Sequence, residues 1–381
     1  MKVNDLATQS ELGLTAKSPR WAVAYKFKAE QAHSRLREVS FQVGRTGVVT
    51  PVANMDPVPL AGTMVKRASL HNIDIIRELG LHLGDMVVIE KGGEIIPKIV
   101  GVDEDKRGAE AKTVEFPANC PVCGAKLVRA EGEAAYYCPN YNACDPQIIG
   151  RLIHFVERGA MDIEQLGDEK IEQLYRSGLI RNFSSLYSLT VDDLLDLPGF
   201  QQKSATKTIE AIEESKKRSF DRVLFAIGIR YVGNTVAKRL AEAFPDIDAL
   251  MSASIEQLIS AQDIGEKIAA SVYNFFRNEQ NQQEIAALRE AGLKMTANKV
   301  VLASNSLEGK LFVVSGVFEQ IGREELKALI ASHGGKVTGS ISKKTDFVVA
   351  GANMGPAKLE KANALGVKII GFDELNGMIS D

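Results

Sequence analysis

The sequence predicts a multidomain protein in which a β-barrel, a four-cysteine metal module, an all-α region and a small α/β module follow one another. Three observations support this prediction. All four cysteines of the 381-residue chain lie between Cys120 and Cys144. The residues before this cluster have strand-like patterns, and those after it have helical ones. The last part of the chain alternates short apolar strands with helices.

Composition places the chain among globular proteins. The length exceeds one ordinary core and predicts about two to four domains. Hydrophobic residues make up 45% and charged residues 25%, which is usual for a folded protein. No apolar run approaches the roughly 20 residues that span a bilayer, and the first residues lack the apolar core of a signal peptide. Since paired metal-type cysteines suit a reducing compartment, we expect a cytoplasmic protein without a membrane partner.

The cysteines have the spacing of a metal site. Cys120 and Cys123 form a C-x2-C pair, and fourteen residues later Cys138 and Cys144 form a C-x5-C pair. Four thiolates close a tetrahedral shell around Zn²⁺ and leave no position for water, so the pattern predicts a structural zinc. Four buried free cysteines are the alternative, but packing alone does not require such clustering. Zinc in sites of this kind contributes on the order of 10 kcal/mol to folding.

The stretch before the cysteines predicts a small β-barrel. Strand-like runs alternate with glycine-marked turns, and one short helix with Asn72 as its N-cap interrupts them. The runs lie at 39–43, 48–52, 64–67, 86–91 and 95–102, and the helix at 72–79. Five strands with one inserted helix are typical of an OB-fold, which often lies on nucleic acid.

Two basic residues in this half are candidate binding residues. Arg45 lies in a Gly-Arg-Thr-Gly turn at 44–47, where glycines let the backbone approach a phosphate or a groove edge. In a predicted strand at 18–27, alternation places Lys26 on a face with small residues, which leaves room for a ligand. The alternatives are a turn with a solvated arginine and a solvated edge lysine.

The helical part contains an internal repeat. Four times an apolar residue followed by glycine or glutamine opens an amphipathic helix, as at 235–244 and 267–276. The second positions are 167, 201, 233 and 265. Tetratricopeptide and ankyrin arrays have a similar period, but their sequence patterns are absent. The repeat is typical of helix-hairpin-helix elements, although a single glycine at a helix boundary is commonly just a cap.

In such elements the glycine lets the hairpin pass close to a phosphate. The amides and the positive end of the next helix then hold the anion. This mechanism needs few lysines, which agrees with 18 Lys/Arg against 22 Asp/Glu in residues 150–295 and a net charge of −3. Contacts of this kind position a duplex without reading its sequence.

Residues 306–381 predict a separate α/β module with a parallel sheet. Ser315, Gly316 and Lys358 fall at strand and helix ends, where they could gather around a phosphate. A module that binds only protein is the alternative. Across the whole sequence there is no Walker loop, no G-x-S-x-G and no H-E-x-x-H motif, and we find no convincing nucleophile.

Together these features resemble the C-terminal part of bacterial NAD-dependent DNA ligases, over essentially the whole chain. Residues 2–4 and 18–27 are similar to the family's fourth and fifth nucleotidyltransferase motifs. The motifs at 44–47, 68–72 and 93–97 resemble its OB-fold, and the cysteines its zinc finger. The hairpins resemble its helix-hairpin-helix domain, and the last module its BRCT domain. The implied domain bounds are 1–34 for a remnant of the adenylation domain, 35–107 for the OB-fold, 117–146 for the zinc finger, 147–296 for the hairpins and 306–381 for the BRCT domain.

The resemblance implies nick sealing in DNA replication and repair. In the family a lysine takes AMP from NAD and passes it to the 5′-phosphate at a nick, and the 3′-hydroxyl then displaces it. Lys2 and Lys26 would line the AMP pocket, and Arg45 would touch DNA near the nick. The hairpin contacts to DNA would come from Gly167, Gly199, Gly233 and Gly265. NAD and Mg²⁺ would serve the complete enzyme on nicked double-stranded DNA, and we expect a monomer.

The sequence departs from the family pattern in several places. It holds no K-x-D-G motif with the nucleophilic lysine and no NAD-binding domain, so we expect a fragment or partial gene that does not adenylate itself. Gln201 stands where the second hairpin should have its second glycine, although Gly199 remains. Cys144 is followed by Asp-Pro-Gln in place of Pro-Ala-Gln.

Two other classes of protein stay open. One is a non-catalytic DNA-binding scaffold of replication or repair, which differs in whether Lys2 and Lys26 belong to a nucleotide pocket. The other is a zinc-stabilised protein-interaction array, which would not retain DNA near physiological salt.

Overall fold

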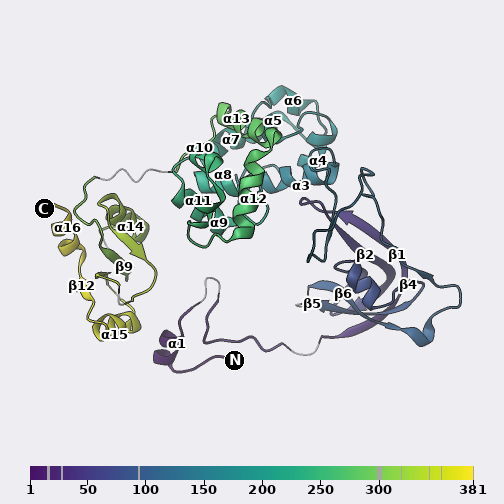
Figure 1. Cartoon of the computed structure of the whole chain (residues 1–381), viewed down its shortest axis with the longest axis horizontal. Helices are drawn as coiled ribbons and strands as arrows, with labels where there is room; N and C mark the ends of the chain where they lie inside the picture. Colours follow the sequence, from purple (N-terminus) through teal and green to yellow (C-terminus); the bar gives the residue numbers. More distant parts are fainter. Residues whose placement is uncertain are drawn as a thin grey trace. The chain divides into compact units, whose positions relative to one another are not determined.

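A computed structural model gives the fold of the chain (Figure 1). The structure describes residues 1–14, 18–26, 29–92, 95–297, 303–318, 320–342, 344–352 and 354–380. Residues 28–298 form one compact unit, and residues 1–27 and 299–381 form the other. The predicted linker at 296–305 and the motif at 93–97 fall partly outside the described residues. Every helix in the described part of the chain is too short or too polar to cross a membrane.

Five strands form a closed barrel, as predicted. Their order is β1-β5-β6-β3-β2, and β1 also pairs with β2. The pairings are antiparallel except for the short contact of β3 with β6. The strands are β1 (Gln31–Val43), β2 (Val48–Leu60), β3 (Thr63–Ser69), β5 (Met86–Gly92) and β6 (Ile96–Asp103). The predicted OB-fold is confirmed, with longer strands on both sides of the turn at 44–47.

Alternating side chains fill the barrel. Leu36 and Ile89 are fully buried because successive residues of a strand point to opposite faces. Helix α2 (Ile73–Glu78) packs two isoleucines into the same core. The Asn72 side chain accepts a hydrogen bond of 2.9 Å from the amide of Asp74, which confirms the predicted N-cap.

The cysteine segment joins the barrel to the helical region. Its strand β8 (Tyr136–Tyr137) adds to the barrel sheet beside β2. Helix α3 (Asp145–Val156) begins directly after Cys144. A separate short pair, β4 (His82–Leu83) with β7 (Lys112–Thr113), precedes the cysteines. The last zinc-type ligand is therefore the N-cap of the first helix of the next region.

Within residues 157–297, all of which are described, ten further helices follow α3, as the helical pattern predicts. The predicted helices at 235–244 and 267–276 correspond to α9 and α12. The ten are α4 (Asp168–Arg176), α5 (Phe183–Leu186), α6 (Val191–Leu195), α7 (Gln202–Ser215), α8 (Phe220–Ala226), α9 (Asn234–Ala243), α10 (Ile247–Ser252), α11 (Ile255–Ile259), α12 (Glu266–Arg277) and α13 (Glu279–Glu290).

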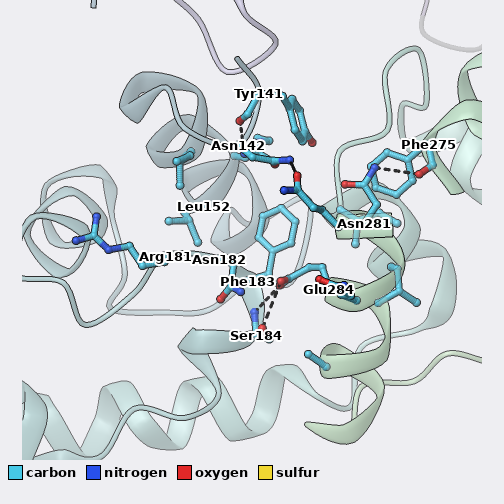
Figure 2. A pocket seen from close by; sticks show the side chains of 17 residues that line it. Tyr141, Asn142, Leu152, Arg181, Asn182, Phe183, Ser184, Phe275, Asn281 and Glu284 are labelled. Carbon is cyan, nitrogen blue, oxygen red and sulfur yellow. Dashed lines mark hydrogen bonds between the residues drawn. The ribbon is translucent and has the colours of Figure 1, made fainter. Parts of the chain in front are cut away.

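A cavity of about 380 Å³ lies among α3, α5, α12 and α13 (Figure 2). The Glu284 carboxylate accepts hydrogen bonds from the amide and the hydroxyl of Ser184, at 2.7 and 3.4 Å. Burial raises the pKa of Glu284 above its ordinary value. This carboxyl group ties α13 to the first turn of α5.

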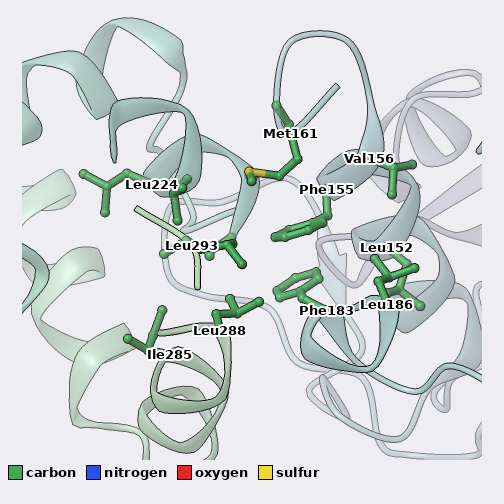
Figure 3. Packing of buried hydrophobic residues seen from close by; sticks show 14 of the residues in the cluster. Leu152, Phe155, Val156, Met161, Phe183, Leu186, Leu224, Ile285, Leu288 and Leu293 are labelled. Atoms are coloured by element: carbon green, nitrogen blue, oxygen red, sulfur yellow. The ribbon is translucent and has the colours of Figure 1, made fainter. Parts of the chain in front are cut away.

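One continuous apolar core runs through the helices (Figure 3). Phe155 of α3 stacks on Phe183 of α5 with ring centroids 4.6 Å apart. Leu152, Leu288 and Leu293 belong to the same buried cluster. Helix α3 therefore begins at a cysteine ligand and ends inside the helical core.

Residues 311–380 form the predicted α/β module. All pairings in its sheet are parallel, in the order β10-β9-β11-β12. The strands are β9 (Leu311–Ser315), β10 (Lys336–Thr338), β11 (Phe347–Ala350) and β12 (Lys368–Ile370). The helices are α14 (Arg323–Ser332), α15 (Pro356–Ala364) and α16 (Phe372–Ser380).

The predicted strand at 18–27 is wrong for the residues of it that are described. Helix α1 (Leu6–Leu12) lies in this N-terminal segment, and Lys2 makes an isolated antiparallel bridge with Ala22. Val23 and Tyr25, which alternation would place on the same side of a strand, are both exposed. Two short paired segments bury too little apolar surface to hold a regular strand by themselves.

Candidate zinc centre and nucleic-acid interface

The four cysteines converge on one point. Their Sγ atoms all lie within 4.8 Å of one another. Cys120 lies 3.9 Å from Cys144, and Cys123 lies 3.4 Å from Cys138, sulfur to sulfur. A tetrahedral zinc with Zn–S bonds of 2.3 Å separates its sulfurs by about 3.8 Å, so the donor set and its geometry fit zinc.

Burial makes two of these thiols hold their protons until a metal ion binds. Burial raises the pKa of Cys138 to about 11 and also raises the pKa of Cys144. Burial acts the same way on Cys123, but hydrogen bonds from Ala125 and Asn140 outweigh it and lower that pKa to about 6. Because zinc binds thiolates, a metal ion must displace the protons from the buried sulfurs.

The glycine turn of the barrel rests on this centre. Gly47 has a φ of 81°, and a Cβ on it would lie 2.6 Å from the carbonyl oxygen of Cys138. The Gln147 side chain donates a 3.2 Å hydrogen bond to that same oxygen. The expectation that the turn's glycines make room for a phosphate is therefore wrong for Gly47, because the zinc module's own backbone fills that space.

Arg45 is exposed beside the helical region. A Cβ on Gly150 of α3 would lie 2.7 Å from the Arg45 Cβ, and a Cβ on Gly228 would lie 3.6 Å from its Nη1. Arg45, Arg151 and Arg230 line one groove of about 820 Å³. The turn thus brings Arg45 to two arginines from elsewhere in the chain, while its contact with DNA stays a prediction.

All four hairpins share one backbone turn. A residue with positive φ is followed by a buried apolar residue and then by the N-cap of the second helix. The positive-φ residues are Gln165, Gly199, Tyr231 and Asp263. The buried residues are Leu166, Phe200, Val232 and Ile264. The N-caps are Gly167, Gln201, Gly233 and Gly265.

Three of these N-caps leave the first-turn amides without a side-chain acceptor. Gly167, Gly233 and Gly265 have φ values of −98°, −88° and −90°, which any residue adopts. A Cβ on any of them would meet no atom within 4 Å, so packing inside the chain does not require glycine. In contrast, five helices of the same region start at side-chain caps, which are Asn182, Thr190, Asp246, Ser254 and Asn278. Open amides at the positive end of a helix suit an anion.

The second hairpin differs from the other three. Gly199 is not the structural counterpart of the three N-cap glycines, because it occupies the position with positive φ, at 86°. Gln201 is the N-cap, and its backbone amide donates a 2.9 Å hydrogen bond to the Ser204 hydroxyl. A phosphate contact of Gly199 stays a prediction.

Lys2 and Lys26 are both exposed. Lys2 lies in the bridge with Ala22, whose neighbour Trp21 accepts a 2.9 Å hydrogen bond from the Val3 amide. Lys26 lies beyond the paired residues. Their joint place in an AMP pocket stays a prediction.

Positive charge gathers in the C-terminal module near the residues predicted there. Ser315 is buried, and Gly316 has a φ of 93°. Burial, together with the charges of Arg323 and Lys327, lowers the pKa of Lys358. This clustering of cations suits the predicted anion site, which stays a prediction.

Sequence reasoning missed one cluster. Glu133, near the tip of the zinc module, contacts Arg230, Tyr231 and Lys267 of the hairpins. Residues about 100 positions apart carry no pairing signal in one sequence. The sequence held only one hint of this cluster, which is that two of its members lie close to N-cap glycines. Tyr231 lies two residues before Gly233, and Lys267 lies two residues after Gly265.

Comparison with known domain families agrees with this architecture. Residues 33–111 match the NAD-dependent DNA ligase OB-fold domain, residues 119–145 its C4 zinc finger domain, and residues 1–30 its adenylation domain. Residues 158–214 match a SAM-like helix-hairpin-helix tandem and residues 222–285 a helix-hairpin-helix motif. Residues 303–379 match the BRCT domain.

Curated relatives match along the whole chain. The DNA ligase of Phocaeicola vulgatus is 56% identical over 381 residues, and that of Bacteroides fragilis is 55% identical over 382 residues. The DNA ligase of Porphyromonas gingivalis is 52% identical over 382 residues. Each alignment covers 100% of this chain and 57% of the relative. Over its whole length the chain is similar to bacterial DNA ligases, and three of its segments match domains of NAD-dependent DNA ligases.

The chain spans a little over half the length of the curated relatives it matches. Its four cysteines are the C4 zinc finger, and the sulfur geometry makes them a structural zinc site. The domain bounds expected from the sequence stay predictions.

Proposed function

We propose that this chain grips the sugar–phosphate backbone of duplex DNA as part of a ligase that seals nicks with NAD. One observation supports the grip above all others. Gly167, Gly233 and Gly265 open three helices whose first-turn amides have no side-chain cap, and a Cβ on each glycine would meet no atom within 4 Å. Such amides hold phosphate without reading sequence, which is what a nick-sealing enzyme needs.

The remaining roles follow the chemistry of the side chains. Arg45 lies in a groove with Arg151 and Arg230, where guanidinium groups can pair with phosphates in bidentate fashion. Lys2 and Lys26 would neutralise the phosphates of AMP as compact charges. NAD and Mg²⁺ belong to the complete enzyme, in which Mg²⁺ would neutralise phosphate charge during AMP transfer.

The zinc finger acts as a brace in this proposal. It pairs with the barrel through β8 and caps α3 of the helical region with Cys144. All four zinc positions are filled by protein, so zinc carries no reactive water. We expect a monomer that works in the cytoplasm.

The test is binding to labelled DNA measured by fluorescence anisotropy from 50 to about 300 mM salt. We expect nicked and intact duplexes to bind with an affinity that falls steeply with salt, as it does when several phosphates are neutralised. Affinity that is absent or insensitive to salt would instead favour a protein-interaction array.

A second arm separates ligase from scaffold. The sequence holds no K-x-D-G motif, so we expect no covalent AMP on this chain after incubation with labelled NAD. Competition by AMP with a fluorescent nucleotide should depend on Lys2 and Lys26 if they belong to a nucleotide pocket. Unchanged competition by AMP in a variant that combines Lys2→Ala with Lys26→Ala would favour the non-catalytic scaffold.

A further inference from the structure

The carboxylate of Glu133 gathers three donors from two hairpins. Its Oε1 accepts a hydrogen bond from the Tyr231 hydroxyl at 2.9 Å, and its Oε2 accepts one from Arg230 Nη2, also at 2.9 Å. Lys267 Nζ lies 3.4 Å from Oε1. Arg230 and Tyr231 belong to the third hairpin, and Lys267 lies in the first turn of α12, which the fourth hairpin opens. An acid from the zinc module thus bridges both.

The donors are held in place by contacts that do not involve Glu133. The Arg230 guanidinium lies 4.4 Å from the ring centre of Tyr137 and 4.9 Å from that of Tyr231. Lys267 Nζ lies 4.7 Å from the Tyr231 ring centre. The Ser271 hydroxyl of α12 donates a 2.7 Å hydrogen bond to the Arg230 carbonyl. The cluster would therefore persist if the carboxylate left it.

Its position is that of the proposed DNA grip. Tyr231 has the positive φ of the shared turn and lies two residues before Gly233. Lys267 lies two residues after Gly265. A phosphate brought to the open amides of α9 and α12 would approach two cations and a hydroxyl, and it would meet the negative charge of Glu133 among them.

Glu133 is charged under all ordinary conditions. Hydrogen bonds from the hydroxyls of Tyr137 and Tyr231, together with Arg230, lower the pKa of Glu133 to about 2. A charged carboxylate with several donors is the side-chain group most like a phosphate, which is also an anion with oxygen acceptors. Two anions at one site repel each other.

We propose that Arg230, Tyr231 and Lys267 form a binding site for one backbone phosphate of DNA, and that the carboxylate of Glu133 occupies this site when DNA is absent. The inference rests on the proposed DNA grip and adds three residues and a competing acid to it. DNA binding then exchanges one anion for another and releases the tip of the zinc module, residues 130–134, from the hairpins.

The test compares Glu133→Gln with Glu131→Gln. Glu131 is exposed on the same tip, and the described residues include no ion-pair partner for it, so its substitution makes the same charge change without emptying the site. We expect E133Q to bind a nicked duplex about three- to tenfold more tightly than wild type, and E131Q to change the affinity less than about twofold. Unchanged zinc content and melting temperature establish that both variants are folded.

A double-mutant comparison makes the site itself testable. In the E133Q background the phosphate pairs directly with Lys267, so we expect Lys267→Ala to weaken DNA binding and to lower the salt slope by about one. E133Q affinity equal to or below that of E131Q would overturn the proposal and leave Glu133 as a structural contact only. If wild type and all variants fail to bind DNA, the DNA grip fails and this inference fails with it.

Discussion

The backbone amide of Cys138 donates a 2.8 Å hydrogen bond to the carbonyl oxygen of Gly47, so a zinc ligand and a barrel turn share one joint. A Cβ on Gly47 would also lie 2.9 Å from Oε1 of Gln147. The close approach on both sides and the positive φ leave room for glycine alone.

We expect Gly47→Ala to destabilise the chain by more than about 2 kcal/mol and to reduce its zinc content, because the new methyl group meets backbone that cannot move freely. Urea denaturation and metal analysis measure the two effects. Gly62→Ala is the control, since Gly62 has a similar φ of 74° but nothing within 4 Å of a Cβ. Equal losses in the two variants would show that the turn conformation, and not the joint, sets the requirement.

Replacing Cys144 by alanine should remove the zinc and loosen the start of α3. A three-sulfur site binds the ion far more weakly, and we expect the metal content to fall from about one per chain to well below half. The melting temperature should fall to that of chelator-treated wild type. Because burial raises the pKa of the Cys144 and Cys138 thiols, zinc should also be released as the pH falls. A variant that keeps its zinc would contradict the four-thiolate site.

Gly265→Ala separates DNA binding from folding. The added methyl group meets open space inside the chain, so we expect a stability loss of no more than about 1 kcal/mol. It should block the close approach of a phosphate and weaken DNA binding about fivefold or more. The reciprocal change, Gln201→Gly, should strengthen binding, since Gln201 occupies the equivalent N-cap of the second hairpin. Alanine without effect on affinity would mean that no phosphate approaches this helix.

Arg45→Ala should weaken DNA binding about fivefold and lower the salt slope by about one, without unfolding the barrel. Its side chain is exposed and supports no described ion pair, so little stability depends on it. Arg37→Ala is the matched control, because the Arg37 guanidinium is already bonded to Asp56 at 2.7 and 2.8 Å. Equal effects of the two substitutions would mean that Arg45 contributes only general positive charge and no specific phosphate contact.

Glu284 predicts a pH dependence of stability. Its folded-state pKa is raised by burial, so its favourable contribution is present below the unfolded-state value and is lost as the pH rises through the folded-state value. Glu284→Gln keeps an acceptor for the Ser184 amide without the buried charge. We expect a higher melting temperature than wild type at neutral pH and a flatter profile in mildly acidic solution. Glu290→Gln, exposed on the same helix, should change neither.

The predictable parts of the molecule are those whose structure is determined by residues close together in the sequence. Cysteine spacing predicts the zinc site because four ligands of one ion must lie in two short turns. The recurring apolar-glycine pair predicts the hairpins because each copy repeats the same turn. Asn72 and the glycines around it mark the inserted helix and the strand ends for the same reason.

The parts that were missed depend on contacts between distant segments. Glu133 meets Tyr231 only because the zinc finger folds back on the hairpins, and no periodicity reports that contact. Gly199 and Gly233 are both glycines beside a hairpin turn, yet Gly199 has a positive φ and Gly233 is an N-cap. The segment at 18–27 alternates like a strand, but alternation alone does not supply a sheet to pair with.

Helix α3 couples the metal centre to the helical core, since its N-cap is Cys144 and Phe155 lies near its other end. The twelve residues of α3 therefore belong both to the zinc module and to the helical core, which would otherwise open independently. Hydrogen exchange in the amides around Phe155 and Phe183 should accelerate when zinc is withdrawn, although no zinc ligand lies among them. Loss of the metal would then make the unfolding of the helices less cooperative, in addition to unfolding the zinc finger locally.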